Sequence, residues 1–262
     1  SFFKTRKLLV KGKQPQIVFS SSGTTGVDTS MHYVASTALY EKSFYEGFRL
    51  FYGEPSQYCI LALLPSYLER EGSSLVYMVK NLIELSGHPQ SGFFLHNTDD
   101  LVSIILENEK KQQKTIVLGV TFALLELSQK FKADLKYTTI METGGMKGRG
   151  KELIRNELHF ILKNSFGVKT IHSEYGMTEL LSQAYSMGEG IFKAPPWMRV
   201  VVRDPYDPFT ILPNGRSGAL NIIDLANIFS CSFIQTDDLG IVHSDGTFEV
   251  LGRMDGSQLR GC

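Results

Sequence analysis

The alternation of short apolar runs with helical patterns most constrains what this chain can fold into. Three apolar runs, each followed by a stretch with helical spacing, occur at residues 58–64 and 73–87, 92–95 and 99–111, and 115–120 and 122–131. A fourth pair, at residues 137–145 and 151–167, leads into a further apolar run at 168–176. Strands that alternate with helices form βαβ units, in which parallel strands lie at the centre and helices cover both faces. The sequence therefore predicts an α/β fold with a parallel βαβ core.

Two of these helical patterns carry clear end signals. Over residues 73–87, Ser73 or Ser74 can serve as N-cap, ahead of an apolar stripe formed by Leu75, Met78, Val79, Leu82 and Ile83. Over residues 151–167, we expect Gly167 to end the helix. The inward face of that second helix is predicted to carry Leu158, Ile161 and Leu162.

The texture changes after about residue 180. Short strand-like segments at 198–205, 213–225 and 239–253 are separated by Pro, Gly, Asn and Asp. This composition predicts a smaller antiparallel β region, with a hairpin turn at "SDGT", residues 244–247. We place a boundary near residue 188, which gives an α/β subdomain of residues 1–187 and a β-rich subdomain of residues 188–262 with a C-terminal arm.

Charge and cysteine content exclude several classes of protein. Lys plus Arg equals Asp plus Glu at 27 each, so no net field favours nucleic acid or an anionic membrane surface. The three cysteines (Cys59, Cys231 and Cys262) are too scattered for a disulfide framework or a paired-cysteine zinc site. No apolar run approaches the ~20 residues that span a bilayer. We therefore expect a cytoplasmic protein with no membrane span and no nucleic-acid partner.

A loop of Ser, Thr and Gly follows the apolar run at residues 17–19. Its members are Ser21, Ser22, Gly23, Thr24, Thr25 and Gly26. Glycines let backbone N–H groups turn toward an anion and hydroxyls add donors, so a strand, this loop and a helix would form a phosphate-binding site. The loop lacks the lysine of a Walker motif. A Ser/Thr-rich surface turn is the alternative interpretation.

A second polar stretch, "SEYGMTE", spans residues 173–179. Tyr175 beside Gly176 can stack on a planar base, Thr178 can donate to a phosphate, and Glu179 can ligate a hard cation such as Mg²⁺. The alternative is a polar connection whose tyrosine only packs.

The third stretch covers residues 235–255 and contains Asp238 and Arg253. A carboxylate at the end of a strand can accept the hydroxyls of a ribose, and an arginine after a strand can bind the same sugar or a phosphate. Alone, this stretch is ordinary turn chemistry.

Taken together and in this order, the three stretches resemble the motifs of the adenylate-forming enzymes, the superfamily of acyl-CoA synthetases, luciferases and peptide-synthetase adenylation domains. The family motifs Ser-Ser-Gly-Thr-Thr-Gly, Tyr-Gly-x-Thr-Glu, and Thr-Gly-Asp-Leu followed by Gly-Arg-x-Asp correspond here to residues 21–26, 175–179, 236–239 and 252–255. The resemblance covers nearly the whole chain. It implies the N-terminal domain fold of that superfamily, with ATP and Mg²⁺ bound.

The resemblance also implies a role for each matching residue. The loop of residues 21–26 would grip the β- and γ-phosphates, Tyr175 would lie against adenine within the Tyr175-Gly176-Met177 segment, and Thr178 would contact the α-phosphate. Glu179 would hold Mg²⁺. The remaining implied contacts are with ribose, through Asp238 and Arg253, and with adenine, along the backbone of Gly144 and Gly145.

The chain departs from the superfamily pattern in two places. Val27 to Ser30 stand where the family loop continues with Pro and Lys, and the sequence stops soon after Arg253. Full-length synthetases carry there a mobile C-terminal domain with a second catalytic lysine. We therefore expect no large C-terminal domain.

In both of these departures, the chain resembles the acyl-protein synthetase (LuxE-like) branch of the superfamily. That branch implies activation of a long-chain fatty acid as acyl-AMP with release of pyrophosphate, and then acyl transfer to a cysteine thiol. Cys262 is the expected acyl carrier, with an acyl-CoA or fatty-acid reductase as partner. Two alternatives stay open: a fragment of an acyl- or aryl-CoA ligase, and a degenerate adenylate-binding module without catalysis.

Overall fold

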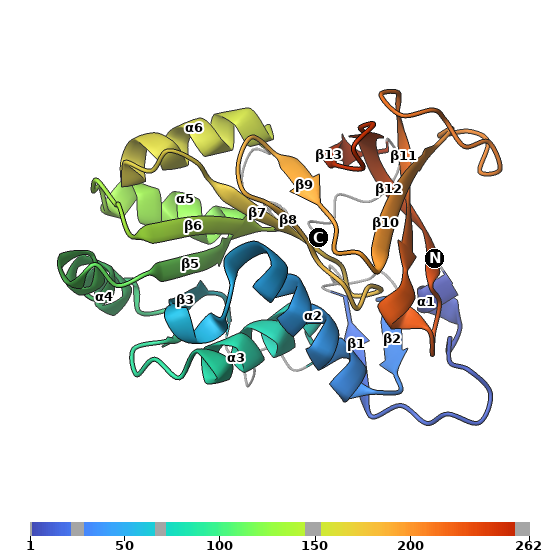
Figure 1. The fold of residues 1–262 in the computed structure, drawn as a ribbon, viewed down its shortest axis with the longest axis horizontal. Helices are drawn as coiled ribbons and strands as arrows, with labels where there is room; N and C mark the ends of the chain where they lie inside the picture. The colour runs from blue at the N-terminus through green and yellow to red at the C-terminus, as the bar shows by residue number, and fades with distance from the viewer. Residues whose placement is uncertain (1, 22–28, 66–71, 145–152, 255–262) are drawn as a thin grey trace.

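The computed structural model of this chain describes residues 2–21, 29–65, 72–144 and 153–254, and the ribbon is drawn in Figure 1. The helices are α1 (Phe2–Thr5), α2 (Thr37–Tyr52), α3 (Ser74–Ser86), α4 (Thr98–Lys111), α5 (Thr121–Lys130) and α6 (Arg155–Phe166), with short 3-10 turns η1 (Pro55–Gln57) and η2 (Leu225–Asn227). The first strands are β1 (Ile17–Ser20), β2 (Met31–Val34), β3 (Cys59–Leu63), β4 (Gly92–Phe93), β5 (Thr115–Val120), β6 (Thr138–Thr143) and β7 (His172–Tyr175). The later strands are β8 (Ala184–Ser186), β9 (Ile191–Lys193), β10 (Met198–Arg203), β11 (Ser217–Asp224), β12 (Phe233–Val242) and β13 (Phe248–Arg253).

A large mixed sheet carries both halves of the described chain. Its order is β10-β11-β12-β13-β9-β8-β7-β6-β5-β3-β4. Strands β4, β3, β5, β6 and β7 pair in parallel, whereas every pairing from β7 to β10 is antiparallel. In Figure 1, α5 and α6 cover one face of the parallel part, and α2 and α3 cover the other. The predicted fold class, a parallel βαβ core followed by an antiparallel region, is confirmed.

The N-terminal segment differs from the expected strand, loop and helix. Strand β1 pairs antiparallel with β2 in a separate two-stranded sheet, so a second strand stands between residues 21–26 and the next helix. That helix, α2, has no counterpart among the predicted elements, although its start carries a clear signal. Ser36 accepts a hydrogen bond from the Leu39 amide as N-cap, and the buried aromatic side chains that follow at four-residue spacing are Tyr40, Phe44 and Phe48.

The predicted helix ends are confirmed, and one predicted core residue is wrong. Ser73 caps α3 through the Val76 amide, and Gly167 ends α6 in the left-handed conformation. On α6, Leu158 and Leu162 are buried, but Ile161 is 37% exposed. A helix packed on one side buries a stripe about 100° wide, and Ile161 lies beside that stripe rather than within it.

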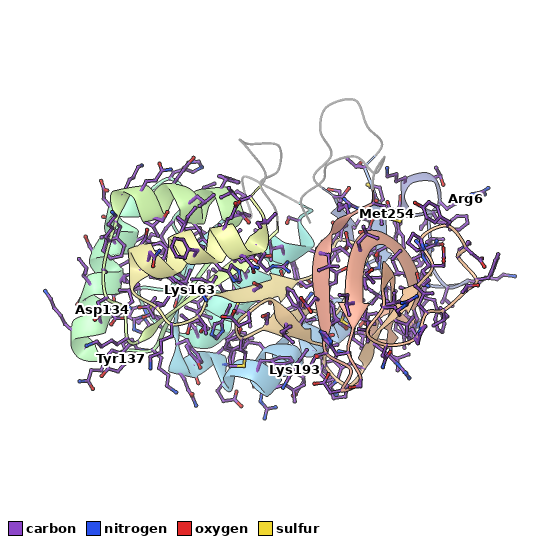
Figure 2. All side chains as sticks on the ribbon, turned by 90° about the horizontal axis from the view of Figure 1, so that it is seen from above. Arg6, Asp134, Tyr137, Lys163, Lys193 and Met254 are labelled. Carbon is purple, nitrogen blue, oxygen red and sulfur yellow. The ribbon has the colours of Figure 1, made fainter. Side chains whose placement is uncertain are left out.

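Among the described residues, buried hydrophobic side chains form two clusters. The larger surrounds the parallel strands, and the smaller includes Tyr175, Phe192, Leu220 and Phe248 of the antiparallel region. Figure 2 shows Asp134, Tyr137 and Lys163 at the α/β end of the molecule and Arg6 and Met254 at the β-rich end. The division into subdomains at residue 188 stays a prediction.

The hairpin turn predicted at residues 244–247 is present between β12 and β13, where the His243 amide donates to the Thr247 carbonyl.

Among the described residues, no helix combines the length and the apolar character needed to cross a lipid bilayer.

Candidate nucleotide-binding site

Tyr175 joins the second and third sequence motifs. It is the last residue of β7, and its hydroxyl donates a 2.7 Å hydrogen bond to Oδ2 of Asp238 on β12. Both side chains are buried, at 5% and 2% exposure. The tyrosine ring also packs edge-on against Phe192 and Phe248. The sheet thus brings into contact two residues that are 63 positions apart in sequence.

Arg253 completes this group from the next strand. Asp238 and Arg253 are direct partners in the antiparallel pair β12–β13, and Arg253 Nε lies 3.4 Å from Asp238 Oδ1. Burial raises the pKa of Asp238, while the Tyr175 hydroxyl and the Arg253 charge oppose this effect. The result is a carboxylate, a guanidinium and a phenol clustered at one point of the sheet.

The described part of the first motif is Ser21, just after β1. Its backbone amide donates to the Ser30 carbonyl at 3.0 Å, and its hydroxyl accepts from the Ser30 amide at 2.9 Å. The other members of the predicted phosphate loop (Ser22, Gly23, Thr24, Thr25 and Gly26) lie outside the described residues. So do Gly145 and Cys262.

Gly144 follows the end of β6 with a φ of +66°. Residues with a Cβ rarely adopt this conformation, so the backbone here favours glycine. Its carbonyl accepts a hydrogen bond from the Thr121 hydroxyl at the start of α5. The contact of this backbone with adenine stays a prediction.

Glu174 is a buried acid beside the motif that was not among the predicted site residues. Its Oε2 accepts a hydrogen bond from the Thr143 hydroxyl, which links the ends of β7 and β6. Burial, with a further contribution from Glu142, raises the pKa of Glu174 to about 7. A Cβ added to Gly176 would lie 2.5 Å from Glu174 Oε1, so a larger residue after Tyr175 requires this carboxyl to shift. The sequence signal that could have identified Glu174 is an acidic residue at a strand position that faces the core.

The loop that carries Thr178 and Glu179 rests on buried polar residues that were also not predicted. His32 on β2 and Asn227 in η2 contact the carbonyls of Thr178 and Glu179. Burial lowers the pKa of His32, and its contacts with Thr178 and Asn227 oppose that effect. The side chains of Met177, Thr178 and Glu179 are half-buried.

The donor set fits a magnesium nucleotide. Within the described residues, no three His, Cys, Asp or Glu side chains are arranged to hold a metal ion. Mg²⁺ needs no such cluster, because it is commonly held by one or two carboxylates together with substrate phosphates and water. Glu179 supplies a partly exposed carboxylate of this kind, and the acid–guanidinium pair on β12 and β13 suits a ribose.

Comparison with known proteins gives a consistent result. No family model matches the chain. Among curated proteins, the long-chain-fatty-acid–luciferin-component ligase of Vibrio harveyi is 27% identical over 148 residues, which cover 52% of this chain and 38% of the relative. ATP-bound MatB from Rhodopseudomonas palustris matches over 90% of this chain and 47% of its own, at 18% identity and a TM-score of 0.66. The fold is that of the adenylate-forming enzymes.

Other members of the adenylate-forming superfamily show the same relation. O-succinylbenzoate coenzyme A synthetase from Bacillus subtilis, with ATP and magnesium ion, matches over 93% of this chain and 52% of its own, at 18% identity and a TM-score of 0.59. The luciferase-like enzyme of the mealworm Zophobas morio matches over 91% of this chain at 17% identity and a TM-score of 0.60. The proteins to which the chain is similar belong to the adenylate-forming superfamily, as the resemblance of the three motifs predicts. The chain spans about half the length of these solved structures and 38% of the length of the curated relative.

Proposed function

We propose that this chain activates a carboxylic acid with ATP, forming an acyl-adenylate and releasing pyrophosphate. The observation that carries the proposal is the convergence of Tyr175, Asp238 and Arg253 from three strands. These residue types serve a nucleoside: the carboxylate and guanidinium hydrogen-bond sugar hydroxyls, and the Tyr175 hydroxyl fixes the carboxylate.

The remaining residues divide the work of holding the triphosphate. In this proposal Ser21 and the rest of the loop through Gly26 bind the β- and γ-phosphates, and Thr178 donates to the α-phosphate. Glu179 would hold Mg²⁺, which neutralises phosphate charge when bound. Gly144 and Gly145 pass their backbone along the adenine, while Gly176 and Met177 connect the base to the phosphate contacts. Positioning dominates such a reaction, because phosphoryl and nucleotidyl transfer ask little covalent chemistry of the protein.

The substrate that we propose is a long-chain fatty acid. The name of the Vibrio harveyi relative refers to a long-chain fatty acid. A carboxylate oxygen attacks the α-phosphorus as the bond to pyrophosphate breaks, which leaves a mixed anhydride with AMP.

The second step in this proposal is transfer to a cysteine thiol. A thiolate sulfur attacks the acyl carbon and AMP leaves, so a thioester replaces the anhydride. Cys59 is unsuited, because it is fully buried and burial raises its pKa. Cys231 is half-buried. We assign the carrier role to Cys262, from the resemblance to the acyl-protein synthetases. A fatty-acid reductase in the cytoplasm would accept the acyl group.

Intact-mass spectrometry tests both steps together with pyrophosphate exchange. The chain is incubated with ATP, Mg²⁺ and a long-chain fatty acid, as wild type, Cys262→Ser and the matched control Cys231→Ser. We expect a hydroxylamine-labile acyl adduct on wild type and Cys231→Ser, none on Cys262→Ser, and carboxylate-dependent exchange of pyrophosphate into ATP in all three. An adduct that persists on Cys262→Ser removes this cysteine from the mechanism.

The absence of exchange in the wild type would contradict adenylation itself and favour a binding module without catalysis. A parallel incubation with coenzyme A separates the other alternative. The matched structures include a coenzyme A synthetase. Release of acyl-CoA without a protein adduct would identify the chain as part of a CoA ligase.

A further inference from the structure

We propose that His32 is a positioning residue for the candidate site: together with Asn227 it fixes the backbone of Thr178 and Glu179, so that their side chains point at phosphate and Mg²⁺. The inference rests on the proposed function for the identity of the ligand. Its structural part depends only on contacts among described residues.

His32 is fully buried, whereas histidines in folded proteins are on average only partly buried. It lies on β2, and its Nδ1 is 2.8 Å from the Thr178 carbonyl oxygen, 146 residues away. A carbonyl can only accept, so Nδ1 carries the hydrogen. The imidazole thereby ties the sheet that precedes α2 to the loop that follows β7.

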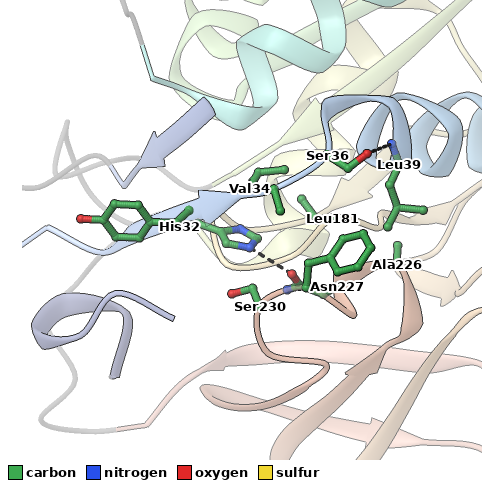
Figure 3. A pocket seen from close by; sticks show the side chains of 11 residues that line it. His32, Val34, Ser36, Leu39, Leu181, Ala226, Asn227 and Ser230 are labelled. Carbon is green, nitrogen blue, oxygen red and sulfur yellow. Dashed lines mark hydrogen bonds between the residues drawn. The ribbon is translucent and has the colours of Figure 1, made fainter. Parts of the chain in front are cut away.

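Asn227 extends the same support by one residue. Its Oδ1 lies 3.0 Å from His32 Nε2, which donates to it when the ring carries a second proton, and its Nδ2 donates to the Glu179 carbonyl at 2.7 Å. Figure 3 shows His32 and Asn227 facing each other, with Val34, Leu39 and Leu181 around them, at the wall of a small cavity. Two consecutive carbonyls of the motif are therefore held by two side chains that also touch one another.

Asp224 holds the continuation of the loop. Its carboxylate is fully buried and accepts from the Leu181 amide at 2.8 Å and the Ser182 hydroxyl at 2.6 Å. Residues 176–183 contain no helix or strand, and the Leu180 amide donates to the Met177 carbonyl at 3.0 Å across a turn whose central residues are Thr178 and Glu179. The buried polar groups hold this turn in place against the rest of the fold, because a buried carbonyl or amide left without its partner is destabilising.

The position of Thr178 and Glu179 makes this constraint functional rather than only structural. Rotation of the peptide that joins them would move both side chains, and the proposed contacts to the α-phosphate and Mg²⁺ depend on their direction. Loss of His32 should therefore weaken MgATP binding more than its effect on stability explains.

The test compares His32→Leu and Asn227→Leu with His32→Gln and the control Asn108→Leu. Asn108 is equally buried and donates to the Thr115 hydroxyl, at the amino end of the parallel strands rather than at the site. We expect the first two variants to raise the KM for MgATP in pyrophosphate exchange about tenfold, which corresponds to about 1.4 kcal/mol and is typical of one lost buried hydrogen bond. The glutamine amide can still donate to Thr178, so His32→Gln should stay within about threefold, and Asn108→Leu should leave KM unchanged.

Amide hydrogen exchange gives a second measurement that needs no activity. Without nucleotide, His32→Leu should speed exchange of the amides of residues 179–182 about tenfold relative to Asn108→Leu, for the same lost interaction. A KM and an exchange rate equal to those of the control would overturn the proposal. If the wild type shows no pyrophosphate exchange, adenylation fails, and the amide rates alone decide whether His32 positions this loop.

Discussion

Glutamine in place of Glu174 should remove a pH dependence from the stability of the fold. Glu174 is buried between the ends of β6 and β7, where Thr143 donates to its Oε2. Glutamine has the same shape as the protonated acid and still offers an oxygen to Thr143. The change therefore removes ionisation while keeping the packing and this hydrogen bond.

The expected magnitude follows from the two pKa values. In the unfolded chain the carboxyl ionises near its ordinary value of 4.5, whereas burial raises its pKa in the fold to about 7. Between these pH values the folded state binds the extra proton, so the free energy of unfolding falls as pH rises, by about 1.4 kcal/mol per pH unit. Ionisation of Glu174 thus lowers the free energy of unfolding by about 3 kcal/mol, and this decrease is complete above pH 7.

Urea denaturation at pH 5, 6, 7 and 8 measures this loss. We expect Glu174→Gln to be more stable than wild type by about 0.7 kcal/mol at pH 5 and by about 3 kcal/mol at pH 8. Glu84→Gln, at a side chain that is 62% exposed, controls for the general effect of neutralising a carboxylate. A constant difference between Glu174→Gln and wild type from pH 5 to pH 8 would refute the reasoning.

Three further substitutions test local geometry. Tyr175→Phe removes the hydroxyl that donates to Asp238 at 2.7 Å, so calorimetry should show that the free energy of unfolding falls by about 1–3 kcal/mol. Titration should show a weaker affinity for ATP, and an unchanged affinity would count against the site. Gly176→Ala places a Cβ 2.5 Å from Glu174 Oε1, so exchange activity should fall although the fold survives, and full activity would show that the carboxyl can move aside. Gly167→Ala forces a Cβ to 2.6 Å from neighbouring backbone at a φ of +64°. The free energy of unfolding should therefore fall by about 1 kcal/mol or more, which lowers the thermal midpoint by several degrees; an unchanged midpoint would contradict this.

Local signals in the sequence determined the elements and many of their ends. The run at residues 115–120 is β5 without adjustment, and Ser73 and Gly167 bound their helices as predicted. These signals work because capping, turn geometry and apolar spacing depend on residues within about one helical turn of each other. The three motifs indicated the superfamily for a related reason, since each is a short contiguous stretch.

Tertiary structure decided which of these residues meet. Asp238 contacts Tyr175 although β13, β9 and β8 lie between β12 and β7 in the sheet order, an arrangement that no local spacing encodes. His32 lies in the separate β1–β2 sheet and is fully buried against the Thr178 carbonyl of the loop after β7, and Ile161 is exposed because α6 packs on one side. Sequence spacing fixes what a segment can form by itself. The partner of a side chain depends on pairings between distant strands, whose free energy comes from burying the whole sheet at once.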